Sequence, residues 1–453
     1  MNLQEVLRDL ADEAPAPAVP PGLFDRVRRR RRQRWLAAAV VVLVLVLSGY
    51  GGIVVDQHRA HVAAGPDGLP GAIADPPRWT KEFAGSPNGP ASVVFWGPAV
   101  SGPAFTGTAA PPTPMAVVGL SRDTYRIVYP SQPSLALSPD GRTLLLPYVR
   151  YNGDTPHWRV DALDLPTGAS RTVVTDFVPL RWTADGRHVL LVQPTRWFTP
   201  EATAETINDA SVMVMSWPSG QIDWTLHVAR PNPFEGENNY HLALSPDASM
   251  LAVSTSGELR VYRRDGSLLW HRTVGLDLVA GPAAWLGDGR IAIMDRSVTS
   301  CGGCPEPNWT DPSALRLDFV DAATGEPALG RVYPAVTSAF SVQVLAWRGD
   351  TAYAVVRSGS RQARAALYRF RPNAAAPERV LSMPGGASDM TVATDYVDSV
   401  RPAGPADFGV SGAQVLSMIV DASRPAGALI VVGVLLWYWR RSRRRLRPVP
   451  PAP

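Results

Sequence analysis

Leu135-Ala136-Leu137-Ser138-Pro139-Asp140-Gly141-Arg142-Thr143-Leu144 is the stretch that decides the fold of this chain, because an apolar run breaks at a short acidic turn and then resumes. Glycine and aspartate tolerate the positive φ that twist-matched hairpin turns need, so the stretch predicts two antiparallel strands and a tight turn. The same pattern of an apolar run, a short turn and a second apolar run recurs along the chain. The turns are Ser138-Pro139-Asp140-Gly141, Thr183-Ala184-Asp185-Gly186, Ser245-Pro246-Asp247-Ala248, Leu286-Gly287-Asp288-Gly289 and Trp347-Arg348-Gly349-Asp350.

A second strand pair with its own turn follows each of these hairpins. The second turns are Pro166-Thr167-Gly168, Pro218-Ser219-Gly220, Arg264-Asp265-Gly266, Ala323-Thr324-Gly325 and a looser one at 372–374. The first unit is then expected to hold strands at 134–138, 143–149, 158–165 and 170–174. Four antiparallel strands repeated every 40 to 60 residues or so are typical of a propeller blade.

A sixth blade is predicted from the two ends of the region, by combining 90–129 with the β-like segment 390–398. Closing the ring with strands from both ends removes the free sheet edges that promote aggregation. The predicted fold class is therefore all-β, a β-propeller of four-stranded antiparallel blades. Six blades are favoured and seven are the alternative, and a pair of stacked β-sandwiches is the competing architecture.

The run 135–144 resembles the Ser-Pro-Asp-Gly repeat of the WD-repeat-like, TolB-type β-propellers of bacteria. Residues 242–251 give a second good match and 181–191 a weaker one. The resemblance covers about 300 residues in the propeller size range. It implies a fold more than a chemistry, since that family includes binding platforms, assembly proteins and propellers attached to hydrolases.

The positive charge is concentrated at the two ends of the chain. Residues 1–34 carry eight Arg and five acidic residues, and residues 440–453 carry six Arg and no acidic residue. Subtracting these contributions of +3 and +6 from the net charge of +4 leaves −5 for residues 35–439. A nucleic-acid partner for the main domain is therefore not expected.

Two apolar segments predict membrane spans. Residues 35–55 contain no charge and are long enough to cross roughly 30 Å of hydrocarbon, and the arginines before them place the N-terminus in the cytoplasm. A cleaved signal peptide is the alternative. A second run, 425–439, ends in Trp437-Tyr438-Trp439 ahead of the basic tail and predicts an exit back to the cytoplasm, the alternative being a helix lying on the membrane surface.

These spans define the expected organisation and place the propeller outside the plasma membrane of a bacterium, with both termini cytoplasmic. The expected parts are a cytoplasmic segment 1–34, a transmembrane helix 35–55, a Gly/Pro/Ala-rich stalk 56–89, the extracytoplasmic propeller 90–400, a linker 401–422, a second transmembrane helix 423–439 and a basic cytoplasmic tail 440–453.

No motif for an enzyme, cofactor or metal centre occurs. The chain lacks a Gly-x-Ser-x-Gly elbow, a phosphate-binding Gly-x4-Gly-Lys loop, a His-Glu-x-x-His pair and a dinucleotide fingerprint. Cys301 and Cys304 are predicted to form a structural disulfide, because the expected topology places them outside the cytoplasm. A redox-active pair and half of a metal site are the alternatives. We therefore expect no catalytic activity, no cofactor and no metal.

Loop lengths predict where the propeller binds. In a four-stranded antiparallel blade the two hairpin turns lie on one side, whereas the central connections and the crossings to the next blade lie on the other. The expected insertions, at 150–157, 194–210, 230–240, 295–314 and 357–364, all fall on this second side. The predicted ligand-binding residues in them are Tyr151, Trp197, Phe198, Phe234, Glu237, Asn238, Tyr240, Asn308 and Trp309. Aromatic anchors among polar groups are typical of recognition surfaces, the alternative being that they pack beneath their own loops.

The N-terminal segment carries an apolar stripe. Leu3, Val6, Leu7 and Leu10 are spaced to share one face of a short helix, which would be stabilised by a cytoplasmic partner protein. This layout resembles membrane-bound regulators of extracytoplasmic-function sigma factors, although their zinc-binding His and Cys pattern is missing. A disordered tail bound to lipid headgroups is the alternative. The sequence thus predicts a membrane-anchored platform that binds an extracytoplasmic protein, peptide or glycan, with transmembrane signalling as the second function.

Overall fold

The computed structural model describes residues 66–77, 80–97, 100, 114–131, 136–152, 155–193, 209–229, 241–255, 257–275, 278–295, 313–328, 330–358, 364–382 and 387–409. The chain divides into two compact units, 1–61 and 62–453, and all the described residues belong to the second. Within them the regular structure is β-strand with two short 3-10 turns, η1 (Phe83–Gly85) and η3 (Thr394–Tyr396). The all-β prediction is confirmed.

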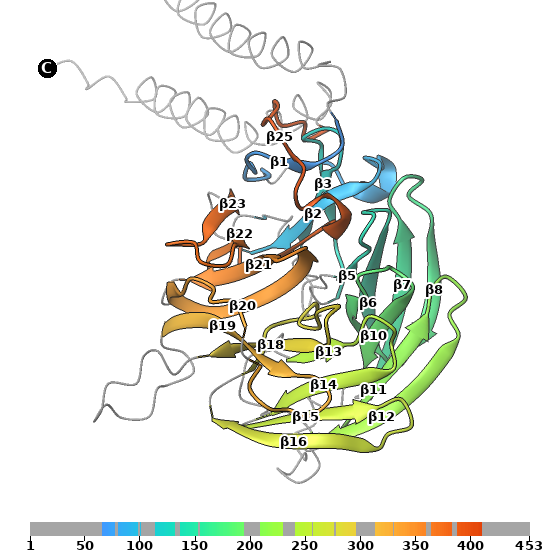
Figure 1. The fold of residues 1–453 in the computed structure, drawn as a ribbon. Coiled ribbons are helices and arrows are strands. Elements are labelled where there is room, and N and C mark those ends of the chain that lie inside the picture. The colour runs from blue at the N-terminus through green and yellow to red at the C-terminus, as the bar shows by residue number, and fades with distance from the viewer. Residues whose placement is uncertain are drawn as a thin grey trace, which may run out of the picture. The chain divides into compact units, whose positions relative to one another are not determined.

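Three four-stranded antiparallel sheets follow one another along the middle of the chain (Figure 1). The first contains β5 (Ala136–Leu137), β6 (Thr143–Asn152), β7 (Thr155–Asp164) and β8 (Ser170–Thr175). The second contains β9 (Val178–Trp182), β10 (His188–Val192), β11 (Asp209–Ser216) and β12 (Ile222–Ala229). The third contains β13 (Leu242–Leu244), β14 (Met250–Thr255), β15 (Gly257–Arg263) and β16 (Leu268–Gly275).

A seven-stranded sheet comes next. Its strands are β17 (Leu278–Val279), β18 (Arg290–Asp295), β19 (Ser313–Asp321), β20 (Val336–Arg348), β21 (Thr351–Ser358), β22 (Arg364–Phe370) and β23 (Glu378–Ser382). Strands β19 and β20 share only two register pairs, Ser313 with Ala339 and Leu315 with Val336.

The remaining four-stranded sheet joins the two ends of the fold, in the order β24 (Asp389–Val392), β2 (Ala91–Trp96), β3 (Met115–Gly119) and β4 (Tyr125–Val128). Strand β24 pairs antiparallel with β2, with Val94 opposite Thr391. The predicted combination of 90–129 with 390–398 in one sheet is thereby confirmed.

Five apolar clusters of the described residues join these sheets into a closed ring. They connect β2–β4 with β5–β8, β5–β8 with β9–β12, β9–β12 with β13–β16, β13–β16 with β17–β23, and β20–β23 with β2 and β24. Successive side chains of a strand point to opposite faces, so Val189 and Leu191 pack against one neighbouring sheet and Leu190 against the other. Burial on both faces explains why the strands are continuously apolar, and the arrangement is that of a β-propeller.

The repeated turns share one hydrogen-bonding pattern. The Ser138 hydroxyl donates to Asp140 Oδ1 at 2.6 Å and accepts the Thr143 N–H at 2.9 Å. Thr183 with Asp185 and Ser245 with Asp247 repeat it at 2.7 and 2.6 Å. A residue next to the aspartate has positive φ in each of the five turns, and glycine adopts this conformation without strain. These residues are Gly141, Gly186, Ala248, Gly289 and Gly349. Ala248 takes this place in the third turn, with φ of 56°.

Segments on either side of the predicted propeller belong to the same folded unit. Strand β1 (Leu69–Pro70) pairs in parallel with β25 (Val400–Arg401), and Leu69, Ile73 and Phe83 are buried. Arg401 forms a buried ion pair with Asp123 at 2.6 Å. The prediction of a stalk across 56–89 is therefore wrong for its described part, because a segment more than 300 residues away supplies the partner strand.

One predicted loop is also corrected. Residues 150–157 were expected to form an insertion, but β6 and β7 pair along this stretch, with Tyr151 opposite Pro156. Only the sequence Gly153-Asp154 separates the two strands, and a Gly-Asp pair between two strand-like runs is typical of a two-residue hairpin.

Candidate functional site

The predicted binding residues mostly fall outside the described residues. The backbone of Tyr151 lies in β6, and Trp197, Phe198, Phe234, Glu237, Asn238, Tyr240, Asn308 and Trp309 lie outside the described residues. Cys301, Cys304, Leu3, Val6, Leu7 and Leu10 also lie outside them. These assignments stay predictions.

The two predicted membrane spans also stay predictions. Across the part of the chain that the structure describes, no helix is long and apolar enough to cross a membrane. Both 35–55 and 423–439 lie outside that part.

The described residues form a cavity of about 210 Å³ at one end of the ring's channel. Inner strands β9, β13 and β20 contribute to it, together with residues of the first-hairpin turns such as Thr183, Pro246 and Gly287. We call this end, defined by the first-hairpin turns, the turn side. The opposite end, where the central connections and blade crossings lie, is the loop side.

Three tryptophans line the cavity; Trp182 and Trp285 stand just before a first-hairpin turn, and Trp347 is the first residue of one. Trp182 Nε1 donates to Ala136 O at 2.9 Å, Trp285 Nε1 to Ala243 O at 2.7 Å and Trp347 Nε1 to Ala283 O at 2.7 Å. Each acceptor belongs to the inner part of the preceding blade. The indoles therefore fasten neighbouring blades while presenting carbon surface to the cavity.

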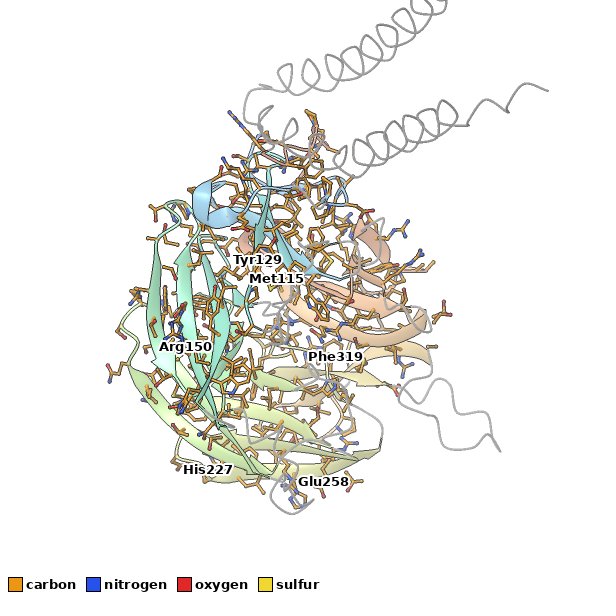
Figure 2. All side chains as sticks on the ribbon, turned by 180° about the vertical axis from the view of Figure 1, so that it is seen from behind. Met115, Tyr129, Arg150, His227, Glu258 and Phe319 are labelled. Carbon is orange, nitrogen blue, oxygen red and sulfur yellow. The ribbon has the colours of Figure 1, made fainter. Side chains whose placement is uncertain are left out.

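Further ring contacts fix the position of Trp347. Its ring centroid lies 6.2 Å from that of Phe319 and 6.1 Å from that of Tyr333. Phe319 lies in β19, on the flank of the ring that carries the seven-stranded sheet (Figure 2). The Tyr333 hydroxyl donates to Asp350 O at 2.8 Å. Trp347 is therefore packed against two further aromatic rings at this wall of the cavity.

Arg181 is one of two arginines that line the cavity. Its Nη2 donates to Gln343 Oε1 at 3.1 Å, a contact that crosses from β9 to β20. Burial lowers the pKa of Arg181 to about 10, which still leaves the guanidinium protonated at neutral pH. The cavity therefore holds a half-buried cation that is hydrogen-bonded to Gln343.

A second arginine lies deeper in the channel. Arg357 of β21 forms an ion pair with Asp389 of β24, and Ser341 stands opposite it in the β20–β21 register. Burial and, secondarily, the charge of Arg181 lower the pKa of Arg357 to about 10. The positive charge of Arg181 thus disfavours the protonated form of Arg357 and contributes to its lowered pKa.

Arg348 lies at the mouth of the cavity. It is exposed, and its Nη2 donates to Thr394 O at 2.7 Å, so the side chain extends from β20 toward the closing sheet. Burial raises the pKa of nearby Asp395, while Arg348 opposes that shift. Arg348 is thus the second arginine of the cavity lining, with the carboxylate of Asp395 nearby.

None of these cavity residues was among the predicted site residues. Reasoning from loop lengths directed attention to the loop side, whereas the cavity lies on the turn side. A signal was nevertheless present, because tryptophan directly precedes the turns 183–186 and 286–289 and is the first residue of the turn 347–350.

Comparison with known proteins gives no family assignment. No protein family and no curated protein matches this chain. The TolB-type resemblance therefore stays a prediction.

Solved structures give only distant likenesses. The chain is 13% identical to the acylaminoacyl peptidase of Pyrococcus horikoshii, over 58% of this chain and 42% of that one, with a TM-score of 0.35. It is 12% identical to the β-propeller domain of the trilobed protease from Pyrococcus furiosus, over 63% and 88%, with a TM-score of 0.35. The chain is also 12% identical to a protein of unknown function from Bacteroides caccae. That likeness covers 66% of this chain and 98% of that one, with a TM-score of 0.36.

The matched region spans less than half the length of the acylaminoacyl peptidases. The propeller assignment of this chain rests on its own sheet order and apolar clusters.

Proposed function

We propose that this chain is a membrane-anchored, non-catalytic β-propeller of six blades whose loop side binds a protein, peptide or glycan outside the cell. The supporting observation is that four long connections between strands lie on one side of the ring. Strand bounds leave long connections at 97–114, 193–208, 230–241 and 296–312, each a central connection or a blade crossing. The first-hairpin turns 138–142, 183–187 and 245–249 are short. Recognition surfaces of propellers and other scaffolds are commonly built on such loops.

The count of six blades follows from dividing the seven-stranded sheet between β19 and β20. The two strands pair over only two positions, whereas β20 and β21 pair along most of their length. Pro327 forms an antiparallel bridge to Val320 and takes the place of an outer strand beside β19. The sheet then supplies two blades, which with the four four-stranded sheets gives six.

Photo-crosslinking in intact cells tests the binding surface. A photoreactive phenylalanine analogue is placed at Trp197 or Trp309 on the loop side, and at exposed Ala169 or Ala323 on second-hairpin turns as matched controls. We expect the same cross-linked species from the two loop positions and none from the controls. Absence of a loop-side adduct, or equal adducts from the control positions, would contradict the proposal.

Cysteine labelling tests the membrane topology. Ala169→Cys, in a background with Cys301→Ser and Cys304→Ser, is expected to react with a membrane-impermeant maleimide in cells whose cytoplasmic membrane is intact. A cysteine in the basic tail 440–453 is expected to react only after the membrane is disrupted. The reverse pattern would overturn the assignment of inside and outside.

The second candidate function is transmembrane signalling, and the apolar stripe of Leu3, Val6, Leu7 and Leu10 favours it. Residues 1–34 are expected to retain a specific cytoplasmic protein in a pull-down, and this retention should be lost in a Leu7→Asp variant. Failure to retain any protein would remove the signalling function and leave the binding platform intact.

A further inference from the structure

We propose that the β22–β23 hairpin is a docking surface for an anionic phospholipid membrane, and that this contact holds the ring on its flank and leaves the loop side free. The inference rests on the membrane anchoring proposed above. Strand β23 is the last strand of the seven-stranded sheet, so the hairpin lies on the outer flank of the ring.

The hairpin is basic in a domain that is not. Residues 364–382 contain four arginines and a single acidic residue, whereas 35–439 as a whole carry a net charge of −5. Residues 209–229 of β11 and β12 contain two acidic residues and no arginine, and 313–328 contain one arginine and three acidic residues. The segments that flank the hairpin, 359–363 and 383–388, contain no acidic residue. The excess of positive charge is therefore a property of this hairpin.

Three of the four arginines are exposed, Arg364, Arg371 and Arg379. The one carboxylate, Glu378, is used within the hairpin. It accepts the Arg369 Nε–H at 3.1 Å, and Arg371 Nη1 lies 3.9 Å from the same oxygen. Within the described residues, Arg364 and Arg379 have no ion-pair partner. Lipid phosphate suits these groups, because a guanidinium binds phosphate through two parallel hydrogen bonds.

The turn between the two strands permits close approach to a surface. Its sequence, Pro372-Asn373-Ala374-Ala375-Ala376-Pro377, contains no charged or aromatic side chain. Ala375 and Ala376 are exposed. Only short side chains therefore stand between the arginines of the hairpin and a layer of headgroups.

The hairpin lies beside the segments that lead to the predicted membrane spans (Figure 1). Leu381 of β23 belongs to the same apolar cluster as Leu69 and Ile73, which lie in or next to β1. Only residues 56–65 and 410–422 separate the described chain from the two predicted spans. Anchoring by these spans raises the effective concentration of the hairpin at the membrane, so that a weak electrostatic contact is sufficient.

The end segments beside the hairpin are acidic. Their exposed carboxylates are those of Asp67, Asp75, Glu82, Asp395, Asp398 and Asp407. Asp407 lies 3.9 Å from Arg126, and Arg348 lies near Asp395. Within the described residues none of these carboxylates forms an ion pair with Arg364 or Arg379. The flank is therefore polarised, and an anionic surface is expected to contact the hairpin rather than the end segments.

Fluorescence quenching tests the contact on the full-length protein in nanodiscs. Ala375→Cys, in a background with Cys301→Ser and Cys304→Ser, carries a bimane label, and Ser267→Cys in the β15–β16 turn is the control position. Phosphatidylcholine with a spin-labelled headgroup quenches a label that reaches the membrane surface. In nanodiscs that contain phosphatidylglycerol we expect quenching at 375 and not at 267. Quenching at 375 should fall at least about twofold in phosphatidylcholine alone, or in about 1 M salt, where the Debye length is about 3 Å.

Variants locate the contact. Each arginine near an anionic membrane is expected to raise the ratio of docked to free hairpin about fivefold, so Arg364→Gln with Arg379→Gln should lower that ratio at least about tenfold. The matched control, Arg263→Gln with Arg264→Gln, removes two exposed arginines near the β15–β16 turn and should leave the ratio unchanged.

The outcomes separate this inference from the proposed anchoring. A chain that inserts into phosphatidylcholine nanodiscs but shows no phosphatidylglycerol-dependent quenching at 375 overturns the inference and leaves the anchoring intact. A chain that cannot be inserted overturns both. Equal effects of the two arginine pairs contradict the assignment to the hairpin. Binding of polyglutamate at the hairpin without quenching on phosphatidylglycerol nanodiscs would assign the surface to an acidic protein and reject the membrane.

Discussion

Replacing Gly141 by alanine is expected to destabilise the propeller far more than the same change at Gly289. Both glycines stand in an Asp-Gly-Arg turn and have positive φ, of 70° and 83°. A left-handed conformation costs a non-glycine residue about 1 to 2 kcal/mol. Alanine also restricts the unfolded chain, which stabilises the folded state by about 0.4 to 1 kcal/mol. Gly289→Ala should therefore lower the free energy of unfolding by only about 1 kcal/mol.

Gly141 has an additional role at the closure of the ring. A Cβ at this position would lie 2.1 Å from Ala91 O, whereas a Cβ at Gly289 meets nothing within 4 Å. The Ala91 N–H also donates to Gly141 O at 2.7 Å, which joins β2 to the first turn. Relieving the clash by moving the backbone should add about 1 to 3 kcal/mol for overpacking and about 1 kcal/mol for the weakened hydrogen bond.

The expected losses in the free energy of unfolding are thus about 3 to 5 kcal/mol for Gly141→Ala and about 1 kcal/mol for Gly289→Ala. Urea unfolding of the full-length protein in detergent, followed by tryptophan fluorescence, measures both. Equal losses in the two variants would refute the reasoning, because they share the backbone conformation and differ only in the contact between the first and closing blades.

Three further predictions concern contacts within the propeller. Trp285→Phe keeps the ring but removes the indole N–H, and we expect a loss of about 1 to 3 kcal/mol because a buried carbonyl of the preceding blade loses its donor, measured by urea unfolding. Arg401→Ala should cost about 3 to 5 kcal/mol, since Asp123 would stay buried without its ion-pair partner, and Arg401→Ala with Asp123→Ala should recover part of that loss. The Ser245 hydroxyl is the largest cause of the lowered pKa of Asp247, and a carboxylate with a lowered pKa adds stability above its unfolded pKa that is lost as pH falls through the folded pKa. Ser245→Ala should therefore be more destabilising at neutral pH than near pH 3, and an equal loss at both would contradict this.

The strand order of the ring was largely predictable from sequence because it depends on local signals. Turns such as Ser138-Pro139-Asp140-Gly141 fix where a chain reverses, and continuous apolar runs such as 189–192 indicate strands buried on both faces. Even the pairing of 389–392 with 93–96 could be anticipated, because unpaired sheet edges are unfavourable.

Contacts between distant segments were not predictable in the same way. Leu69-Pro70 lies in a stretch rich in glycine and proline, and only the approach of Val400-Arg401 makes it a strand. The indole bonds from Trp182, Trp285 and Trp347 depend on the spacing of neighbouring blades, which no local pattern specifies. The cavity follows from these bonds and from the reach of Arg181 across the channel, so it was missed for the same reason.

Closure of the ring by β24 and β2 is tested most directly by a cross-strand disulfide. Val94 and Thr391 stand opposite each other, and opposed residues of antiparallel strands have the separation that a disulfide requires. In a background with Cys301→Ser and Cys304→Ser, Val94→Cys with Thr391→Cys should oxidise to give a peptide pair linked between 94 and 391 by mass spectrometry. Val94→Cys with Val392→Cys, one residue out of register and facing the opposite side, should not. Equal cross-linking in both pairs, or none in the first, would contradict a closed propeller.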